Sequence, residues 1–576
     1  MRLDKLTIGS AKDSKTHQFK NLKNVTIDFD QDHWVTVVIG WNGTGKSNAL
    51  EALAILFRDL IGKERKPAFA FLLAYRMGAG DALRHIHIDA DPDRAKEPYK
   101  VHVATDDEAR GKNSMLPILE SEPAVSALRG SEIKFKILVA DDSPYLPRYV
   151  FSYYSGESPR MHAIFKPYLE KFDGKLRKGV DPGLKRLFYA MPVHSQFVLL
   201  AFMIQQPAFV SKFLEDHFDI DPDEGLESVL FVLRQPPWKI NAPDSDPRFW
   251  NARGVVSKFL ARLQDVALAP ITVSRTVPTS LWNETKLEFK YLFIRDIAGL
   301  RHLVGKQAPT MFFRDLESTY VSQLIDEVRI RVRLKKNDGS VTFRELSEGE
   351  QQLLTVLGLL RFTAEEESLF LLDEPDTHLN PRWSVDYIHY LKQFISNGAK
   401  EEETSHILLT THNPLAIAEL DREQVQILRI EKTGAQRQIV SCFPEMAPRG
   451  MGYAAIVTSD MFGIASSLDV STQLLLETQR ALSVAETLTT DEQQALDEVN
   501  SELNRLGFRF FHPDDEFSRY LRLRNEALHK RFGVANPLTI AAMAVELSRT
   551  EREELATQLI EELVAEETAE RGQDAQ

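Results

Sequence analysis

The sequence predicts an α/β fold in which buried strands end in polar motifs, followed by a helical C-terminal region. The run Trp34–Ile39 is short, apolar and β-branched, as in a buried strand, and a glycine-rich segment follows it directly. Leu50, Leu53 and Phe57 then recur at helical spacing. Residues 346–440 again alternate helix-like and strand-like segments, and after about residue 455 the chain is helical and charged. Such alternation is typical of an α/β fold.

Composition and charge exclude several classes of protein. The 576 residues carry a formal net charge of −14, so the surface as a whole does not suit a nucleic acid, although a local basic patch remains compatible. Cys442 is the only cysteine, which excludes an internal disulfide and a cysteine-based zinc site within one chain. The charged, strand-like N-terminus does not resemble a signal peptide. Because the apolar stretch Phe197–Ile204 is far shorter than the roughly 20 residues that span a bilayer, we expect a cytoplasmic protein with no membrane partner.

The first motif is a phosphate-binding loop. The segment Gly40-Trp-Asn-Gly-Thr-Gly-Lys-Ser47 fits the pattern G-x-x-x-x-G-K-[ST]. Its glycines let backbone N–H groups surround a phosphate, and the helix that begins at Lys46 directs its positive dipole end at the same anion. We expect Lys46 to reach the β- and γ-phosphates of ATP, and the Ser47 hydroxyl to ligate Mg²⁺. The candidate nucleotide-binding residues of this loop are Gly40, Asn42, Gly43, Thr44, Gly45, Lys46, Ser47 and Asn48.

A pair of carboxylates follows a second apolar strand. In Leu369-Phe-Leu-Leu-Asp373-Glu374, four apolar residues precede two acids. The carboxyl end of a buried parallel strand lies at the sheet edge where a phosphate loop also lies. We expect Asp373 to hold Mg²⁺, usually through water, and Glu374 to orient and polarise the attacking water. By itself the pair is equally compatible with acids that merely end a strand, but its combination with the phosphate loop favours a catalytic site.

Two further motifs flank the carboxylate strand in the sequence. Leu346-Ser-Glu-Gly-Glu-Gln-Gln352 opens a helix, and the N–H groups of a helix start favour an anion, so Ser347, Gly349 and Glu350 are candidate nucleotide contacts. Downstream, Ile407–Pro414 is a strand that ends in His412. Taken alone, the first motif is a capped helix and the second a structural histidine. Their order along the chain, together with the two motifs above, makes them informative.

In that order, the four motifs resemble the ABC-type heads of the SMC, RecF and OLD-like ATPases. LSEGEQQ stands where this superfamily has LSGGQ or LSGGE, and Asp376–Pro381 stands where it has the D-loop. The resemblance implies a two-lobed head that dimerises face to face around two ATP molecules, or assembles further. Ser347 and Gly349 of one chain would then touch the γ-phosphate held by Lys46 of the other. It also implies that His412 senses the γ-phosphate.

The resemblance further implies a Q-loop glutamine that contacts Mg²⁺ and the attacking water. We place it at Gln196, with Gln206 as the weaker candidate because the residues before it read as mid-helix. The expected regions are residues 1–194, the first lobe with a strand-rich insertion, and residues 195–330, a helical insertion. Residues 331–455 would form the second lobe, and residues 456–576 a C-terminal helical region.

Within the superfamily, the sequence is most similar to stand-alone antiphage-defence ATPases of the Septu (PtuA) and retron-associated type. We find no long heptad run, no Cys-x-x-Cys hook and no convincing TOPRIM set, which argues against chromosome-type SMC, break-repair and OLD-type nuclease relatives. The resemblance implies an ATPase that senses DNA or RNA and regulates a separately encoded HNH-type nuclease. A RecF-like repair ATPase is an alternative.

A second alternative comes from Arg524-Asn-Glu-Ala-Leu-His529, which resembles the R-x4-H motif of HEPN ribonucleases. It would make the chain a self-contained RNase toxin gated by its ATPase head. Because arginine and histidine are common enough for such a match to arise by chance in a chain of this size, a solvated helix is the alternative interpretation.

Two charged patterns remain open at this point. Residues His85–Asp93 alternate His and Asp with apolar residues, so one strand face could hold a metal, although an exposed strand face explains the pattern as well. Arg329, Arg331 and Arg333 also alternate, and continue into Lys335 and Lys336. They suit either contacts to a phosphate backbone or ordinary solvent exposure.

Overall fold

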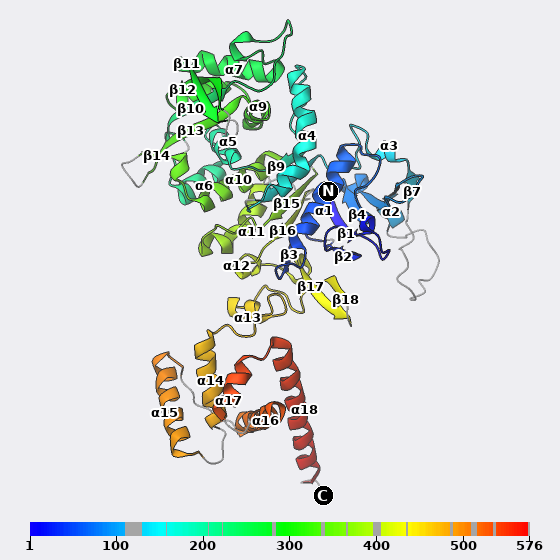
Figure 1. Cartoon of the computed structure of the whole chain (residues 1–576), viewed down its shortest axis with the longest axis vertical. Helices are drawn as coiled ribbons and strands as arrows, with labels where there is room; N and C mark the ends of the chain where they lie inside the picture. The colour runs from blue at the N-terminus through cyan, green and yellow to red at the C-terminus, as the bar shows by residue number, and fades with distance from the viewer. Residues whose placement is uncertain are drawn as a thin grey trace. The chain divides into compact units, whose positions relative to one another are not determined.

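The predicted alternation of strands and helices produces a seven-stranded sheet at the centre of the head, seen in the computed structural model of the whole chain (Figure 1). Its strand order is β18-β17-β3-β16-β15-β8-β9, and all neighbours run parallel except the β17–β18 hairpin. The strands are β3 (Val35–Gly40), β8 (Tyr149–Tyr154), β9 (Leu187–Tyr189), β15 (Ser368–Asp373), β16 (His406–Thr410), β17 (Val425–Thr433) and β18 (Gln436–Cys442).

The structure describes all residues except 31, 110–129, 157, 205–206, 222, 279–283, 336–339, 364–366, 396–404, 434–435, 484–487, 509–514, 534–536 and 574–576. The described chain divides into two units, Met1–Gly450 and Met451–Gln576. Each unit has its own apolar core. None of the helices in the described ranges is long and apolar enough to cross a membrane.

A six-stranded antiparallel sheet covers the phosphate-loop helix α1 (Lys46–Ile61) from the side opposite the central sheet. One continuous core joins Leu6 and Tyr75 of this sheet, Phe57 of α1 and Leu371 of β15. An apolar helix buried on both sides is thereby fixed in position relative to β3 and β15. The order is β2-β1-β4-β5-β6-β7. The strands are β1 (Arg2–Ile8), β2 (Val25–Asp28), β4 (Phe71–Met77), β5 (Arg84–Ala90), β6 (Tyr99–Thr105) and β7 (Ser131–Ile133).

A five-stranded antiparallel sheet lies in the region expected to be mainly helical, and this corrects the sequence-based expectation for residues 195–330. The order is β11-β12-β10-β13-β14. In β10, apolar side chains are buried on both faces, so the sequence lacks the alternation that separates a strand from a buried helix. The strands are β10 (Leu226–Arg234), β11 (Leu268–Pro278), β12 (Glu284–Ile294), β13 (Ile325–Arg333) and β14 (Ser340–Thr342).

Helices connect and cover these sheets within the first unit. The longer ones include α4 (Arg160–Arg177), α10 (Glu348–Thr363) and α11 (Pro381–Ile395). Those of the 195–330 region are α5 (Val193–Phe202), α6 (Ala208–Phe218), α7 (Gly254–Val266), α8 (Ile297–Val304) and α9 (Pro309–Val321). The short ones are α2 (Asp106–Ala109), α3 (Phe135–Leu138) and α12 (Pro414–Ile417).

The regular secondary structure in the described part of the second unit is helical, as the charged, helical pattern predicts. Leu528, Ile540, Leu555 and Leu559 form its core, so three of its helices bury a common apolar face. The helices are α13 (Tyr453–Thr458), α14 (Val470–Ser483), α15 (Thr490–Arg505), α16 (Asp515–Phe532), α17 (Pro537–Val545) and α18 (Arg549–Gln573).

Candidate functional site

The phosphate loop is the turn between β3 and α1, and two of its glycines are required by close contacts. A Cβ on Gly40 would lie 2.3 Å from the Leu428 carbonyl oxygen, in the neighbouring strand β17. Gly45 is the residue before α1 and has a left-handed φ of 93°, with Leu22 packed where a side chain would be. The backbone can therefore turn tightly in front of the helix start. This is the geometry in which successive N–H groups surround a phosphate.

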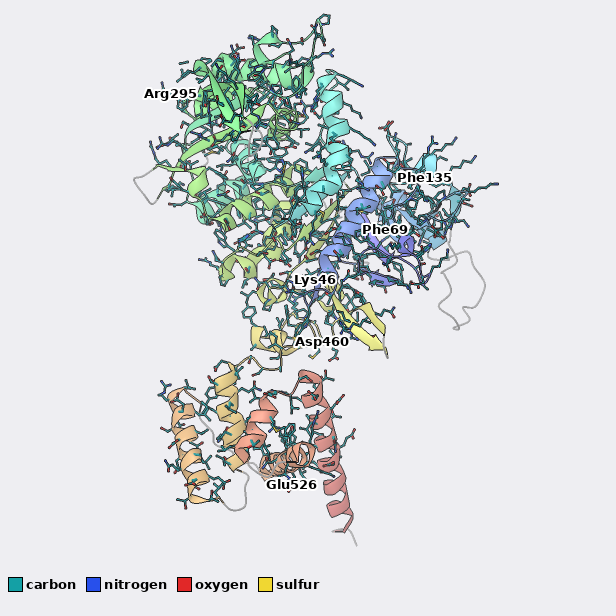
Figure 2. All side chains as sticks on the ribbon, viewed as in Figure 1. Lys46, Phe69, Phe135, Arg295, Asp460 and Glu526 are labelled. Atoms are coloured by element: carbon teal, nitrogen blue, oxygen red, sulfur yellow. The ribbon has the colours of Figure 1, made fainter. Side chains whose placement is uncertain are left out.

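Lys46, labelled in Figure 2, is buried at the start of α1. Its Nζ donates to the Gly40 carbonyl oxygen at 2.8 Å, so the ammonium group folds back over the loop. Burial lowers the pKa of Lys46, and the carboxylates of Glu374 and Asp373 oppose that shift. A cation held near two carboxylates and a phosphate-sized turn is placed to bind a terminal phosphate. Asn42 and Gly43 are exposed at the loop tip, while Thr44 is buried beneath it.

Asp373 ends β15 with its carboxylate fully buried beside Ser47. Oδ1 accepts hydrogen bonds from the hydroxyls of Ser47, at 3.0 Å, and Thr410, at 2.5 Å. Oδ2 is buried and accepts no hydrogen bond from the described residues. Burial raises the pKa of Asp373, and the two hydroxyl donors work against that rise. A hydroxyl, a carboxylate and an unsatisfied buried oxygen form a donor set that fits Mg²⁺, which prefers hard oxygen ligands. Ser47 and Asp373 would hold this ion.

Glu374 follows Asp373 in a left-handed backbone conformation, with φ of 52°. Its N–H donates to the Thr410 carbonyl oxygen at 3.1 Å, which fixes the turn after the strand. One carboxylate oxygen lies 3.3 Å from His412 Nε2, so the side chain faces the end of β16. The hydrogen bond from His412 lowers the pKa of Glu374 against the effect of burial. The group thus stays ionised, as the orientation of an attacking water requires.

The loop after Glu374 is held by a buried carboxyl group. The Thr411 hydroxyl donates to Asp376 Oδ2 at 2.7 Å, and Asn413 caps α12 next to it. Burial raises the pKa of Asp376 to about 6. Through these bonds, the segment that carries His412 and the segment after Glu374 are joined, which keeps the imidazole and the carboxylate at a fixed separation.

The start of α10 packs against the same loop, and Ser347 and Glu350 form a capping box there. The Ser347 hydroxyl and N–H both bond the Glu350 carboxylate, at 2.8 and 2.7 Å. A Cβ on Gly349 would lie 2.4 Å from the His378 carbonyl oxygen, so glycine allows the helix to approach the loop. Gln352 extends this contact by bonding the His378 N–H and the Glu374 carbonyl. In the described part of one chain, the side-chain bonds of Ser347 and Glu350 do not reach the phosphate loop.

Gln196 lies on α5, after β9, and is half-buried. In the sheet, β9 is separated from β15 by β8, a distance of about 10 Å at the usual strand spacing. The hydrogen bonds of the site in the described chain do not include Gln196, and its role stays a prediction. Gln206 lies outside the described residues.

Four polar residues near the loop belong to none of the predicted motifs: Arg160, Glu51, Lys20 and Asn21. Arg160, the first residue of α4, lies 3.5 Å from Asp373 Oδ2 and 3.1 Å from the buried carboxylate of Glu51. Lys20 pairs with Glu51, and the Asn21 amide donates to the Gly43 carbonyl at 2.8 Å. Arg160 follows β8, the strand beside β15. The strand-end argument that identifies Asp373 could have located it, because Tyr149–Tyr154 also reads as a strand.

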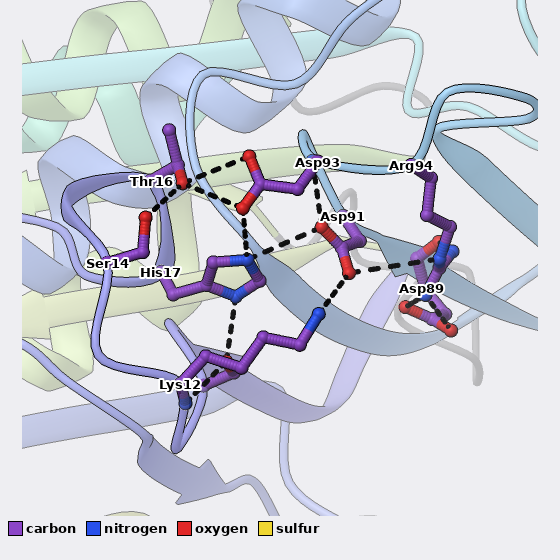
Figure 3. Close-up of polar contacts among 9 residues, drawn as sticks. Lys12, Ser14, Thr16, His17, Asp89, Asp91, Asp93 and Arg94 are labelled. Carbon is purple, nitrogen blue, oxygen red and sulfur yellow. Dashed lines mark hydrogen bonds and ion pairs between the residues drawn. The ribbon is translucent and has the colours of Figure 1, made fainter.

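The acidic end of β5 forms a cluster that the sequence does not predict. Asp91 and Asp93 meet His17 from the N-terminal segment, rather than His85 or His87 (Figure 3). His17 Nε2 lies 2.9 Å from Asp93 and 3.5 Å from Asp91, and the three ligand atoms are within 4.8 Å of one another. Lys12 already donates to Asp91 at 2.9 Å. The cluster therefore joins the N-terminal segment to the end of β5.

The arginine row on β13 is exposed on one face of the strand, as the alternation predicts. Arg329 pairs with Glu327 at 2.9 Å and Arg333 with Glu227 at 3.3 Å, which reduces the positive charge available to a phosphate backbone. Lys336 lies outside the described residues.

Arg524 of the second unit is engaged in an internal ion pair. Its guanidinium lies 2.9 Å from Glu477, which also pairs with Arg480 at 3.1 Å. His529 is exposed on the same helix. A carboxylate held by two arginines explains the position of Arg524 without a substrate, and leaves a nuclease role for Arg524 and His529 untested.

The fold and this site define the class of protein. Residues 16–120 match a family described as "AAA ATPase domain", and residues 222–418 match one described as "AAA domain, putative AbiEii toxin, Type IV TA system". The chain therefore carries AAA-family ATPase domains, arranged as an ABC-type head, and such domains imply nucleotide binding, typically with Mg²⁺.

Two antiphage-defence ATPases are similar to parts of the chain. The first is the "Septu protein PtuA" of Bacillus mycoides (strain KBAB4), which is 24% identical over 159 residues, or 26% of this chain and 21% of the relative. The second is the "Retron Vc95 probable ATPase" of Vibrio cholerae serotype O1 biovar El Tor, which is 27% identical over 127 residues, or 19% of this chain and 23% of the relative. The matched segments thus span less than a quarter of each relative.

Proposed function

We propose that the chain is an ATPase that binds Mg²⁺–ATP between two heads and regulates a separate effector nuclease in antiphage defence. The observation that carries the ATPase part is the convergence of Ser47, Asp373, Glu374 and His412 at the carboxyl edge of one parallel sheet, beside Lys46. Residues 326 positions apart in the sequence, Ser47 and Asp373, share a hydrogen bond there.

Each side chain has a defined task in this proposal. The phosphate loop and Lys46 bind and orient the terminal phosphates. Ser47 and Asp373 hold Mg²⁺, which supplies charge neutralisation at the phosphate oxygens when bound. Glu374, kept ionised by His412, orients a water for attack. In this proposal, His412 would also donate a hydrogen bond to the γ-phosphate.

The active assembly is proposed to be a homodimer or a higher homo-oligomer. Ser347 and Gly349 mark the start of α10, but in one chain their bonds go to Glu350 and the loop after Glu374. A helix start facing outward still offers its positive dipole end to an anion. We therefore assign these residues to the nucleotide held by a second head.

The regulatory part of the proposal draws on the relatives. Both are defence ATPases, and the described chain adds a separate helical unit, Met451–Gln576, to the head. We assign this unit to the docking of a separately encoded HNH-type nuclease, with DNA or RNA as the trigger. The compartment proposed is the cytoplasm.

The test is a purification of the tagged chain from cells that also express its neighbouring genes, for wild type and Glu374→Gln. We expect the variant to retain ATP and to co-purify a nuclease in fixed stoichiometry, identified by mass. Absence of ATP binding would contradict the ATPase proposal. Purification of the chain without a partner, for both wild type and Glu374→Gln, would contradict the effector proposal.

A second candidate is a self-contained ribonuclease, favoured by the matching spacing of Arg524 and His529 on α16. Replacement of both residues by alanine should abolish any growth arrest caused by the chain alone, if this candidate holds. An unchanged arrest would exclude it. A third candidate, a RecF-like repair ATPase, requires that deletion of the gene lowers tolerance of DNA damage.

A further inference from the structure

Arg160 joins the two buried carboxylates that flank the phosphate loop. Its Nε lies 3.1 Å from Glu51 Oε1, and its terminal nitrogen lies 3.5 Å from Asp373 Oδ2. Glu51 comes from α1, one turn after Ser47, and Asp373 ends β15. The Glu51 and Asp373 side chains are only 4% and 0% exposed, while that of Arg160 is 34% exposed. A partly exposed cation thus lies beside two buried anions.

The two carboxylates differ in how strongly they depend on Arg160. Glu51 also pairs with Lys20. Asp373 has both hydroxyl donors on Oδ1, whereas Oδ2 accepts no hydrogen bond, and Arg160 is the one cation among the described residues within 4.0 Å of it. Because an uncompensated buried charge is costly, a cation beside Oδ2 stabilises the ionised form of Asp373.

The same carboxylate is the one that would hold Mg²⁺ together with Ser47. A guanidinium and a divalent cation next to one buried carboxylate repel each other, and little solvent is present to screen them. The guanidinium keeps other partners when it loses Asp373, because its Nε faces Glu51 and its Cζ lies over the Tyr154 ring, 4.5 Å from the centroid, where cation–π attraction acts on it.

We propose that Arg160 is a positioning residue that exchanges with Mg²⁺ at Asp373. It neutralises Asp373 while the head holds no nucleotide, and it leaves that oxygen when Mg²⁺ and ATP bind. This inference rests on the proposed ATP-binding function and adds a residue that reports whether the site is loaded.

The exchange has a structural route to the rest of the head. Arg160 is the first residue of α4, whose 18 residues extend about 27 Å at the usual rise per residue. Figure 1 shows α4 running away from the central sheet, and it packs against α1, β9, α7 and α9. Release of Arg160 removes a polar contact from the first turn of α4, next to the buried Met161 and Phe165. The change is thereby passed to the helices that cover the five-stranded sheet.

The test compares Arg160→Gln, which removes the cation, with Arg160→Lys, which keeps it. Lys166→Gln serves as the matched control, since Lys166 lies on α4 and pairs only at 4.0 Å with Glu170, both exposed. Thermal unfolding of the whole chain is measured at increasing Mg²⁺ concentrations without nucleotide. ATP binding is then measured by calorimetry at several Mg²⁺ concentrations.

We expect the Mg²⁺ site of Arg160→Gln to be half-saturated at an Mg²⁺ concentration about tenfold lower than in wild type, because the guanidinium that competes for Asp373 is gone. A change of about tenfold is a usual size for coupled binding. Arg160→Lys and Lys166→Gln should match wild type. In hydrogen exchange, the first turn of α4 should respond to Mg²⁺–ATP in wild type and already resemble the loaded state in Arg160→Gln.

An unchanged or higher Mg²⁺ requirement of Arg160→Gln overturns the exchange. A variant that folds only with Mg²⁺ supports it, since the metal then replaces the guanidinium, whereas one unfolded at saturating Mg²⁺ contradicts it. If wild type binds no ATP at any Mg²⁺ concentration, the proposed function fails instead, and the two failures are distinguishable.

Discussion

Each unit contains a buried carboxylate beside arginine, but the two carboxylates differ in how completely their oxygens are paired. Asp373 in the head has one arginine at 3.5 Å and an outer oxygen without a hydrogen bond. Glu477 in the helical unit has Arg480 and Arg524 at 3.1 and 2.9 Å, one on each oxygen. A carboxylate that its own chain leaves under-compensated is prepared for a ligand. One that its own chain fully pairs stabilises the fold.

The largest expected effect is on hydrolysis and comes from the under-compensated site. Glu374→Gln should lower kcat for ATP by about 100- to 1,000-fold, because an amide cannot polarise the attacking water. ATP affinity should change little, since Lys46, Ser47 and Asp373 remain. Steady-state hydrolysis and equilibrium ATP binding measure the two quantities. Glu477→Gln is the control and should hydrolyse ATP as wild type does; equal rates for both variants would break the comparison.

The next effect is on stability of the second unit. Glu477→Ala leaves the mostly buried Arg524 and the more exposed Arg480 without their common partner. The free energy of unfolding of that unit should fall by about 3 kcal/mol, near the range for loss of one partner of a buried pair. Denaturant unfolding followed by a probe in residues 451–576 measures it. If the free energy of unfolding falls by no more than it does for a typical surface substitution, the ion pairs of Glu477 contribute little to stability.

Asp376 gives a smaller, pH-dependent effect in the head. Burial raises its pKa to about 6 from an ordinary value of 3.8. The folded state therefore holds this proton more tightly than the unfolded state, and stability falls as the pH rises from 3.8 to about 6. Asp376→Asn keeps an acceptor for Thr411 but does not ionise. The free energy of unfolding of Asp376→Asn, relative to that of wild type, should therefore increase across that pH range and stay constant above it. Urea midpoints measured at several pH values test this. A difference that does not change with pH would contradict the burial argument.

The smallest effect is expected at an arginine pair on the surface. The Arg333 side chain is 69% exposed, and its pair with Glu227 is accordingly screened by water. Arg333→Gln should change the free energy of unfolding by less than about 0.5 kcal/mol. Binding of single-stranded and double-stranded nucleic acid is measured in parallel. A loss of affinity without a loss of stability would assign the β13 row to nucleic-acid contact.

Strand ends were the part of the site that could be predicted most directly from sequence. Asp373 follows four apolar residues and Lys46 follows a glycine turn, and both patterns have strict local causes. β10 was missed because burial on both faces removes the alternation that identifies a strand. Arg160 was missed because its importance comes from Glu51 and Asp373, which are distant from it in the sequence.

The sequence by itself determined the loop, the carboxylate strand and their order, since backbone sterics and apolar periodicity act over a few residues. Only the tertiary structure decided which charges face each other. β16 lies between β3 and β15, so Thr410 and His412 approach Asp373 and Glu374. The sheet likewise places β8 beside β15, and Arg160, which follows β8, thereby reaches the buried carboxylate. Strand order follows from how whole faces pack together, and no local pattern encodes it.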